Sequence, residues 1–129
     1  MMKHLTLLLL LFAAAVTPTC AQSLVNTNWK TYFGDPVNDS LVLHIRTDTS
    51  FVTNRMGTAV VRSVCKISGD TLSFDDYDGE YACPSMVGRY KVSQAEGVLS
   101  FVLIDDPCDG RAGSLPATKW KKVPDTAAK

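Results

Sequence analysis

The four cysteines are the residues whose chemistry would decide most about this chain. Two of them stand in similar surroundings, Cys83 in YDGEYACP and Cys108 in DDPCDGR, where Asp-Gly pairs and prolines favour turns. Cysteines in such turns could bind a metal, act as reactive thiols or form a disulfide. Metal binding and thiol catalysis both need partner residues with suitable spacing elsewhere in the chain.

The acidic stretch DDYDGE, residues 75–80, combines carboxylates with a glycine, as the start of a calcium loop does. The glutamate that such a loop needs at its twelfth position is missing, so an acidic, solvent-exposed turn is the better interpretation. For zinc, the cysteines lack C-x-x-C spacing, and His44 is the single histidine after residue 21. Strand alternation places His44 on an outer face beside Arg46. We therefore expect no metal site and no cofactor.

Catalytic motifs are missing as well. The chain has no G-x-S-x-G and no glycine-rich phosphate loop, and after residue 21 it lacks a second histidine from which a triad could be built. Acid pairs such as Asp105 and Asp106 stand in expected turns. An acid–base pair for glycoside chemistry stays open, because a sequence does not give distances. The expectation is a protein that is not an enzyme.

The first 21 residues have the layout of a secretory signal peptide: a short basic start, an apolar segment from Leu5 to Val16, and small residues after it. Thr19 and Ala21 fit the −3 and −1 positions and predict cleavage after Ala21. The alternative is a lipoprotein anchored through Cys20. The chain is thus expected to be exported, to the periplasm or the extracellular space. No later segment is apolar for long enough to be a transmembrane helix.

The remaining chain is short enough for one domain, which we place at residues 22–123, with a disordered tail at 124–129. Without Lys3, its Lys and Arg number 12 against 13 Asp and Glu, so no nucleic-acid partner is expected. Short runs of Val, Ile, Leu, Phe and Tyr between turn residues predict an all-β fold. The expected strands lie near residues 28–33, 40–46, 50–55, 59–67, 71–76, 86–93, 98–104 and 115–122. Eight strands joined by tight turns favour an antiparallel up-and-down barrel.

A hairpin register links the two cysteines in turns. A four-residue turn at residues 94–97 predicts that the numbers of paired residues sum to 191, so that Tyr90 faces Phe101. Cys83 and Cys108 satisfy the same sum just beyond the two strands. Opposed residues on antiparallel strands are nearly close enough for a disulfide, and an exported chain meets an oxidising compartment. We therefore predict a Cys83–Cys108 disulfide.

A second turn, at residues 68–71, places Cys65 near Phe74 on the next strand. Cys65 shares the predicted inner face of its strand with Ser63 and Ile67. It is interpreted as a small buried core residue rather than as a reactive thiol.

The chain also resembles a known family. LVNTNWK (residues 24–30), ISGDTLSFDD, YACPSMVGRYKV, LSFVLIDDPCDGR and LPATKW resemble small secreted bacterial proteins of the lipocalin-like group, which have calycin-type barrels. The resemblance implies that Trp29 plugs the closed end of the barrel. It also implies that Arg111 packs over this tryptophan.

The barrel predicts a binding function. An eight-stranded barrel either holds one small ligand or is filled by its own side chains. We expect it to bind a small apolar molecule in its mouth, with Ser63 and Tyr90 as orienting polar groups. The predicted interior lining is Leu43, Ile45, Phe51, Val61, Cys65, Phe74, Tyr90, Phe101 and Leu103.

The alternative is a protein-interaction module with a filled core, such as an inhibitor of a secreted protease. This alternative rests on a further likeness to small exported barrels that inhibit metalloproteases through a short N-terminal strand. Residues 22–26 would be that strand here. The loops at residues 77–84 and 105–114 are a second expected contact surface, and Tyr77 and Tyr81 are the aromatic residues there.

Overall fold

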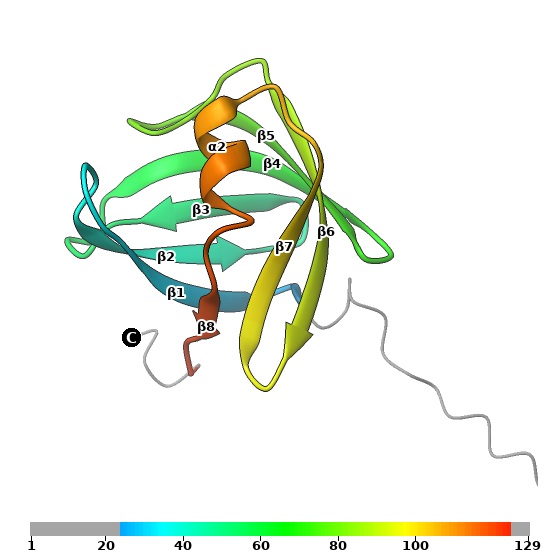
Figure 1. Cartoon of the computed structure of the whole chain (residues 1–129), viewed down its shortest axis with the longest axis horizontal. Coiled ribbons are helices and arrows are strands. Elements are labelled where there is room, and N and C mark those ends of the chain that lie inside the picture. Colours follow the sequence, from blue (N-terminus) through cyan, green and yellow to red (C-terminus); the bar gives the residue numbers. More distant parts are fainter. Residues whose placement is uncertain (1–23, 125–129) are drawn as a thin grey trace, which may run out of the picture.

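The computed structural model describes residues 24–124, which form a closed barrel of eight antiparallel strands (Figure 1). The strands are β1 (Thr27–Phe33), β2 (Asp39–Ile45), β3 (Thr49–Thr53), β4 (Ala59–Ser68), β5 (Thr71–Asp78), β6 (Val87–Ala95), β7 (Val98–Asp105) and β8 (Trp120–Lys122). They follow one another around the barrel in chain order, which confirms the predicted up-and-down topology. The predicted signal peptide lies outside the described residues, as do residues 125–129 of the predicted tail.

Alternating side chains give the strands a buried inner face, because successive residues of a strand point to opposite sides. In β2, Leu41, Leu43 and Ile45 are buried, whereas the residues between them are only partly buried. In β4 the same alternation buries Ser63 and Cys65. These inner faces meet in a single apolar core.

The β6–β7 hairpin is offset by two residues from the predicted register. Tyr90 faces Leu103 rather than Phe101, and the last pair before the turn is Ala95 with Val98. Glu96 and Gly97 form the turn, with φ angles of 54° and 75°. A two-residue turn with positive φ at both positions is the tight hairpin connection that matches the twist of the strands. A shift of two residues keeps every side chain on its face, so the predicted inner face survived the wrong register.

The predicted Cys83–Cys108 disulfide is present, with the two Cα atoms 6.1 Å apart. Cys83 precedes β6 and Cys108 follows β7, so the bond joins the two chain segments that leave the open end of this hairpin. A bulge between Arg89 and Tyr90 further shifts the register near this end. The pairing prediction is therefore confirmed, although the ladder register used to reach it was wrong.

The predicted strand at residues 115–122 is largely wrong. A short helix, α2 (Asp109–Ser114), precedes this region, and β8 covers only Trp120–Lys122. The helix is closed by backbone hydrogen bonds between residues four apart: the Ala112 N–H donates to Cys108 O, and the Leu115 N–H donates to Arg111 O. Two glycines in this six-residue helix lower its helix propensity, which explains why the sequence pattern did not reveal it.

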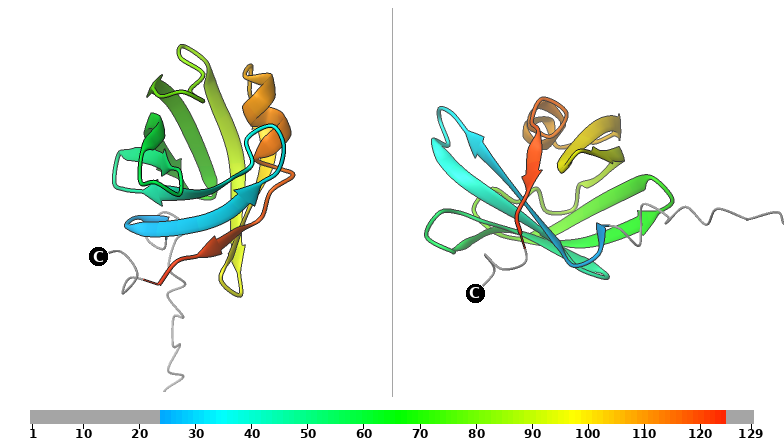
Figure 2. Two further views of the ribbon diagram at one scale, coloured as in Figure 1. Left: turned by 90° about the vertical axis from the view of Figure 1, so that its left-hand side faces the viewer. Right: turned by 90° about the horizontal axis from the view of Figure 1, so that it is seen from below.

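The short β8 leaves part of the barrel wall to α2. β8 pairs with β7 only at Val98 and Leu99, and with β1 only at Trp29 and Lys30. Beyond these pairs, α2 lies between the β1–β2 hairpin and β7 (Figure 2). No helix among residues 24–124 is long and apolar enough to cross a membrane.

Candidate functional site

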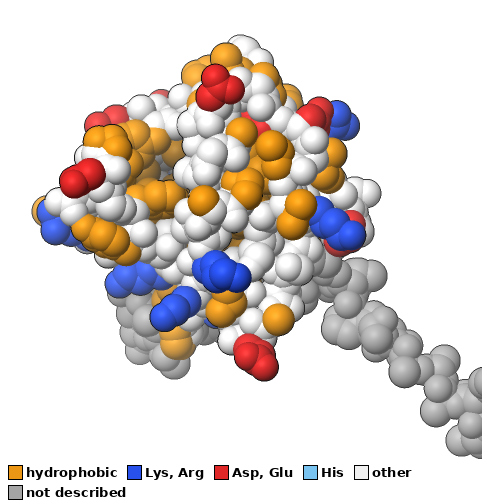
Figure 3. Space-filling model, in the orientation of Figure 1, with side chains coloured by type: hydrophobic (Ala, Val, Ile, Leu, Met, Phe, Trp, Pro, Cys, Tyr) orange, Lys and Arg blue, Asp and Glu red, His pale blue; other side chains and the backbone are white. Residues whose placement is uncertain are grey.

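A cavity of about 450 Å³ opens at the end of the barrel where the β1–β2 loop, the β5–β6 loop and α2 meet. Figure 3 shows hydrophobic side chains in a hollow beside α2. The lining is mainly apolar, and its charged members are Asp76 and Arg111. The lining residues are Phe33, Pro36, Val37, Leu41, Leu43, Ser50, Val52, Val61, Ser63, Phe74, Asp76, Tyr81, Cys83, Cys108, Gly110, Arg111, Ser114, Leu115 and Trp120.

Seven of the nine predicted lining residues fall into two groups. Leu43, Val61 and Phe74 line the cavity, as does the predicted polar group Ser63. Four others, Ile45, Cys65, Tyr90 and Phe101, are buried in the packed core and do not line the cavity. The interior of the barrel is thus partly filled by packed side chains and partly hollow.

Phe51 was predicted inside the barrel and lies on its outer face. The tight β2–β3 turn, closed by the Arg46 N–H bond to Thr49 O, sets Ser50 opposite Ile45 and thus inside. Phe51 therefore points outward, where its ring stacks on His44 with 4.3 Å between the centroids.

Leu103 was also predicted inside, but 43% of its surface is exposed. It pairs with Tyr90 of β6 on one side, but it lies beyond the two β7 residues that pair with β8, so β8 does not continue the wall on its other side. Its neighbours Val102 and Ile104 are likewise exposed, by 60% and 52%. Val102 and Ile104 share one face of β7 and Leu103 points to the other; these three exposed apolar residues are here called the β7 strip.

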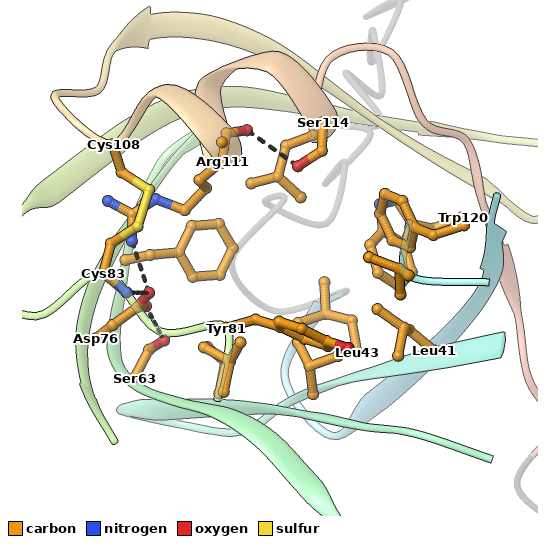
Figure 4. Close-up of a pocket in the computed structure, with 18 of the residues that line it drawn as sticks. Leu41, Leu43, Ser63, Asp76, Tyr81, Cys83, Cys108, Arg111, Ser114 and Trp120 are labelled. Carbon is orange, nitrogen blue, oxygen red and sulfur yellow. Dashed lines mark hydrogen bonds and ion pairs between the residues drawn. A yellow bond between two sulfur atoms is a disulfide. The ribbon is translucent and has the colours of Figure 1, made fainter. Parts of the chain in front are cut away.

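Asp76 is the centre of a polar corner in the cavity wall (Figure 4). Its carboxylate accepts a bond from Ser63 Oγ to Oδ1 (2.5 Å) and one from the Cys83 N–H to Oδ2 (2.9 Å). Arg111 Nη1 lies 3.0 Å from Oδ2. The Asp76 side chain is 3% exposed, so its oxygen atoms are bonded by these protein groups rather than by water.

The sequence interpretation of residues 75–80 as a solvent-exposed turn was wrong for Asp76. β5 continues to Asp78, and alternation from Leu72 and Phe74 carries Asp76 to the buried inner face. The signal was present in the sequence, since Asp76 continues the inward series at intervals of two residues. Its acidic neighbours Asp75 and Asp78 are exposed.

Behind this corner, Asp106 anchors Arg111. Arg111 donates from Nε to Asp106 Oδ2 (2.6 Å) and from Nη2 to Oδ1 (2.8 Å). Tyr90 Oη and the Cys108 N–H donate to the same carboxylate. Burial alone would raise the pKa of Asp106, but the hydrogen bonds from Arg111 and Tyr90 outweigh it and hold the pKa below its usual value. Burial and the adjacent carboxylate raise the pKa of Tyr90, so its hydroxyl stays a donor.

Gly88 provides the room for this ion pair. A Cβ atom at Gly88 would lie 2.4 Å from Asp106 Oδ2 and 3.0 Å from Arg111 Nε. Glycine is therefore needed at this position because a buried ion pair packs directly on the backbone of β6.

The prediction that Arg111 packs over Trp29 was wrong. Trp29 is fully buried, and its Nε1 donates to Thr27 Oγ1 (2.7 Å). Helix α2 carries Arg111 to the cavity end, where it pairs with Asp76 and Asp106. The arginine that contacts the start of β1 is Arg46, whose Nη1 donates to Asn28 Oδ1 (3.1 Å).

Cys65 and His44, the two residues considered for thiol and metal chemistry, lie outside the cavity lining. Cys65 is fully buried, and burial raises the pKa of its thiol to about 11, although a hydrogen bond from Ser50 opposes the shift. His44 lies on the outer face, where its two ring nitrogens contact Asn28 Oδ1 and Thr53 Oγ1 at 2.9 Å. In residues 24–124, no three His, Cys, Asp or Glu side chains come together as a metal site would require.

Several lining residues were missed by the sequence reasoning. Phe33 and Trp120 pack edge to face, with 5.9 Å between the ring centroids, and form the wall that faces the polar corner. Trp120 belonged to the expected last strand, but nothing in that short pattern marked it as facing a cavity.

No protein-family model matches the chain, and neither curated proteins nor solved structures gave a significant match.

Proposed function

We propose that this protein is an exported, non-enzymatic, lipocalin-like barrel that binds one small apolar molecule in its cavity. The observation that carries the proposal is the cavity itself: about 450 Å³, largely apolar, with one polar corner. Sites for small molecules are concave, of roughly 300–1,000 Å³, and combine an apolar lining with a few placed polar groups.

The arrangement of the polar groups supports binding rather than catalysis. Asp106 is committed to Arg111, Tyr90 and a backbone N–H, and Asp76 accepts from Ser63 and Cys83. The pKa of Asp106 is held below its usual value by these hydrogen bonds, whereas a general acid needs a raised pKa. The His44 ring lies on the outer face and does not line the cavity.

Export is supported by two independent features. The Cys83–Cys108 disulfide is a bond of oxidising compartments, and residues 1–21 carry the pattern of a signal peptide. The closed eight-stranded barrel is compatible with lipocalin-like membership, which the sequence resemblance suggested. The mass of the mature protein tests export: cleavage after Ala21 and lipid on Cys20 give different values.

Ligand binding can be tested with N-phenyl-1-naphthylamine, a neutral apolar probe whose fluorescence rises in apolar surroundings. Val61→Phe would fill the cavity from its wall, and Val64→Phe places the same ring on the outer face of the same strand, where Val64 is 38% exposed. We expect one probe per chain, lost in Val61→Phe and retained in Val64→Phe. Equal binding by both variants would show that the probe sits elsewhere.

A second candidate function is supported by the β7 strip. Exposed apolar patches often mark interaction sites. Tyr77 near the end of β5 and Tyr81 in the β5–β6 loop are also exposed, by 58% and 43%. The N-terminal insertion mechanism receives less support, because Leu24 is fully buried and Asn26 N donates to Ile45 O. A protease inhibitor acting through the strip would lose inhibition in Val102→Lys/Ile104→Lys and keep its probe binding. Absence of inhibition by the unmodified protein against secreted metalloproteases would remove this candidate.

A further inference from the structure

The polar corner contains one carboxylate and one guanidinium, and each has hydrogen-bonding capacity that its protein partners do not fill. Asp76 and Arg111 are the charged residues in the cavity lining, and their side chains are 3% and 10% exposed. A carboxylate has about four acceptor positions, and within residues 24–124 Asp76 accepts two hydrogen bonds, from Ser63 Oγ and the Cys83 N–H, beside its ion pair with Arg111. The carboxylate can therefore accept a further bond from a molecule in the cavity.

Arg111 supplies the complementary group. Its Nε and Nη2 atoms donate to Asp106, and Nη2 also donates to Met86 O. Nη1 is buried and has no hydrogen-bond acceptor among residues 24–124, and its 3.0 Å contact with Asp76 Oδ2 is an ion pair. A buried N–H without an acceptor costs free energy, which a suitable ligand atom would recover.

Asp76 offers an oxygen that can accept a hydrogen bond, and Arg111 Nη1, 3.0 Å from Asp76 Oδ2, offers an N–H that can donate one. A ligand group that suits both must be able to donate and to accept. A hydroxyl is both donor and acceptor, so one O–H can donate to Asp76 and accept from Arg111. A carboxylate ligand can only accept, and it would add a third anion beside Asp76 and Asp106. An ammonium can only donate, and it would stand next to the guanidinium. Both charged groups would also lose their hydration on entering a mainly apolar cavity.

The rest of the cavity fits an apolar body. Leu41 and Trp120 lie across the cavity from Asp76 and Arg111 (Figure 4). Resting on the proposed function, we propose that the ligand is a neutral, mainly apolar molecule with a hydroxyl group, and that this hydroxyl donates to Asp76 and accepts from Arg111.

The test is displacement of N-phenyl-1-naphthylamine by ligands of equal length and different head groups. 1-Decanol donates and accepts, nonyl methyl ether only accepts, and decanoate and decylammonium are charged. We expect 1-decanol to bind most tightly, at least about 10-fold better than the ether, as a hydrogen bond to a charged group predicts. In Asp76→Asn, whose folding is checked by thermal unfolding, this advantage should fall to about 2-fold or less, with ether binding unchanged.

The outcomes separate this proposal from the one on which it rests. Equal binding of 1-decanol and the ether to the unmodified protein overturns the hydroxyl proposal and leaves the apolar cavity standing. Tightest binding of decanoate or decylammonium overturns it in favour of a charged ligand. If neither the probe nor any member of the series binds, both proposals fail. The series on the unmodified protein decides the question even if Asp76→Asn does not fold.

Discussion

Replacing Gly88 with alanine tests whether the buried ion pair holds the cavity wall in place. The added methyl carbon would lie 2.4 Å from Asp106 Oδ2, 2.6 Å from Asp106 Cγ and 3.0 Å from Arg111 Nε. Contacts this short cannot persist, and the Asp106 side chain is fully buried, so it has no solvent to move into. The carboxylate, and with it Arg111, must shift from the positions that give their two hydrogen bonds.

The loss of stability expected for Gly88→Ala has two sources. Overpacking a buried site costs about 1–3 kcal/mol, and weakened hydrogen bonds to charged groups cost about 1.5–3 kcal/mol each when they are lost. Because the bonds are weakened rather than abolished, we expect Gly88→Ala to lower the free energy of unfolding by about 2–4 kcal/mol. For a domain of about 100 residues, this lowers Tm by at least about 8 °C.

Urea unfolding followed by tryptophan fluorescence is a suitable assay, because both Trp29 and Trp120 are buried. Gly34→Ala is the matched control: Gly34 has no heavy atom within 4 Å of the added carbon, and its φ is not in the left-handed region. We expect this control to stay within about 1 kcal/mol of the unmodified protein. If Gly88→Ala were as stable as the control, the packing assigned to Asp106 and Arg111 would be refuted.

Three further predictions concern the groups around the cavity. The lowered pKa of Asp106 means that its stabilising contribution is complete above the unfolded-state pKa, about 3.9, and is lost as pH falls through the folded-state pKa. Asp106→Asn should therefore be less stable than the unmodified protein at pH 7, and its free energy of unfolding should fall less between pH 5 and pH 2. Urea unfolding across this pH range measures both values, and equal losses in the two proteins would contradict the prediction. Removing the disulfide by Cys83→Ala/Cys108→Ala opens a loop with a sequence separation of 25 and should cost about 3–4 kcal/mol in the same assay, whereas unchanged stability would refute the assignment. The buried Cys65 thiol, with its pKa of about 11, should react with Ellman's reagent only after unfolding, and rapid reaction of the folded protein would contradict its burial.

The fold was predictable because period-two alternation is insensitive to errors of register. The β6–β7 hairpin was displaced by two residues, yet Tyr90, Val92 and Phe101 remained on the inner face. Phe51 shows the limit of this tolerance. A tight turn that shifts the parity by one residue reverses the whole face, and hydrophobicity alone assigned Phe51 to the wrong side.

The site was less predictable, because its essential members are polar groups in positions usually read as turns. Asp76 could have been found by extending the alternation of Leu72 and Phe74 through the acidic stretch. Arg111 could not have been placed, since its position depends on α2, a six-residue helix with two glycines that has no sequence signature. Its contacts with Asp76 and Asp106 bring together residues that are 35 and 5 positions away in the chain.

Methyl NMR with N-phenyl-1-naphthylamine tests the central claim, that the cavity binds a small apolar molecule, most directly. The account predicts saturable shifts and intermolecular NOEs at the lining methyls of Leu41, Leu43 and Val61, with much smaller changes at Ile45 and Leu99, which are buried in the core and do not line the cavity. Shifts confined to the β7 strip, or no shifts at saturating probe, would contradict a binding cavity and turn attention to the exposed apolar surface.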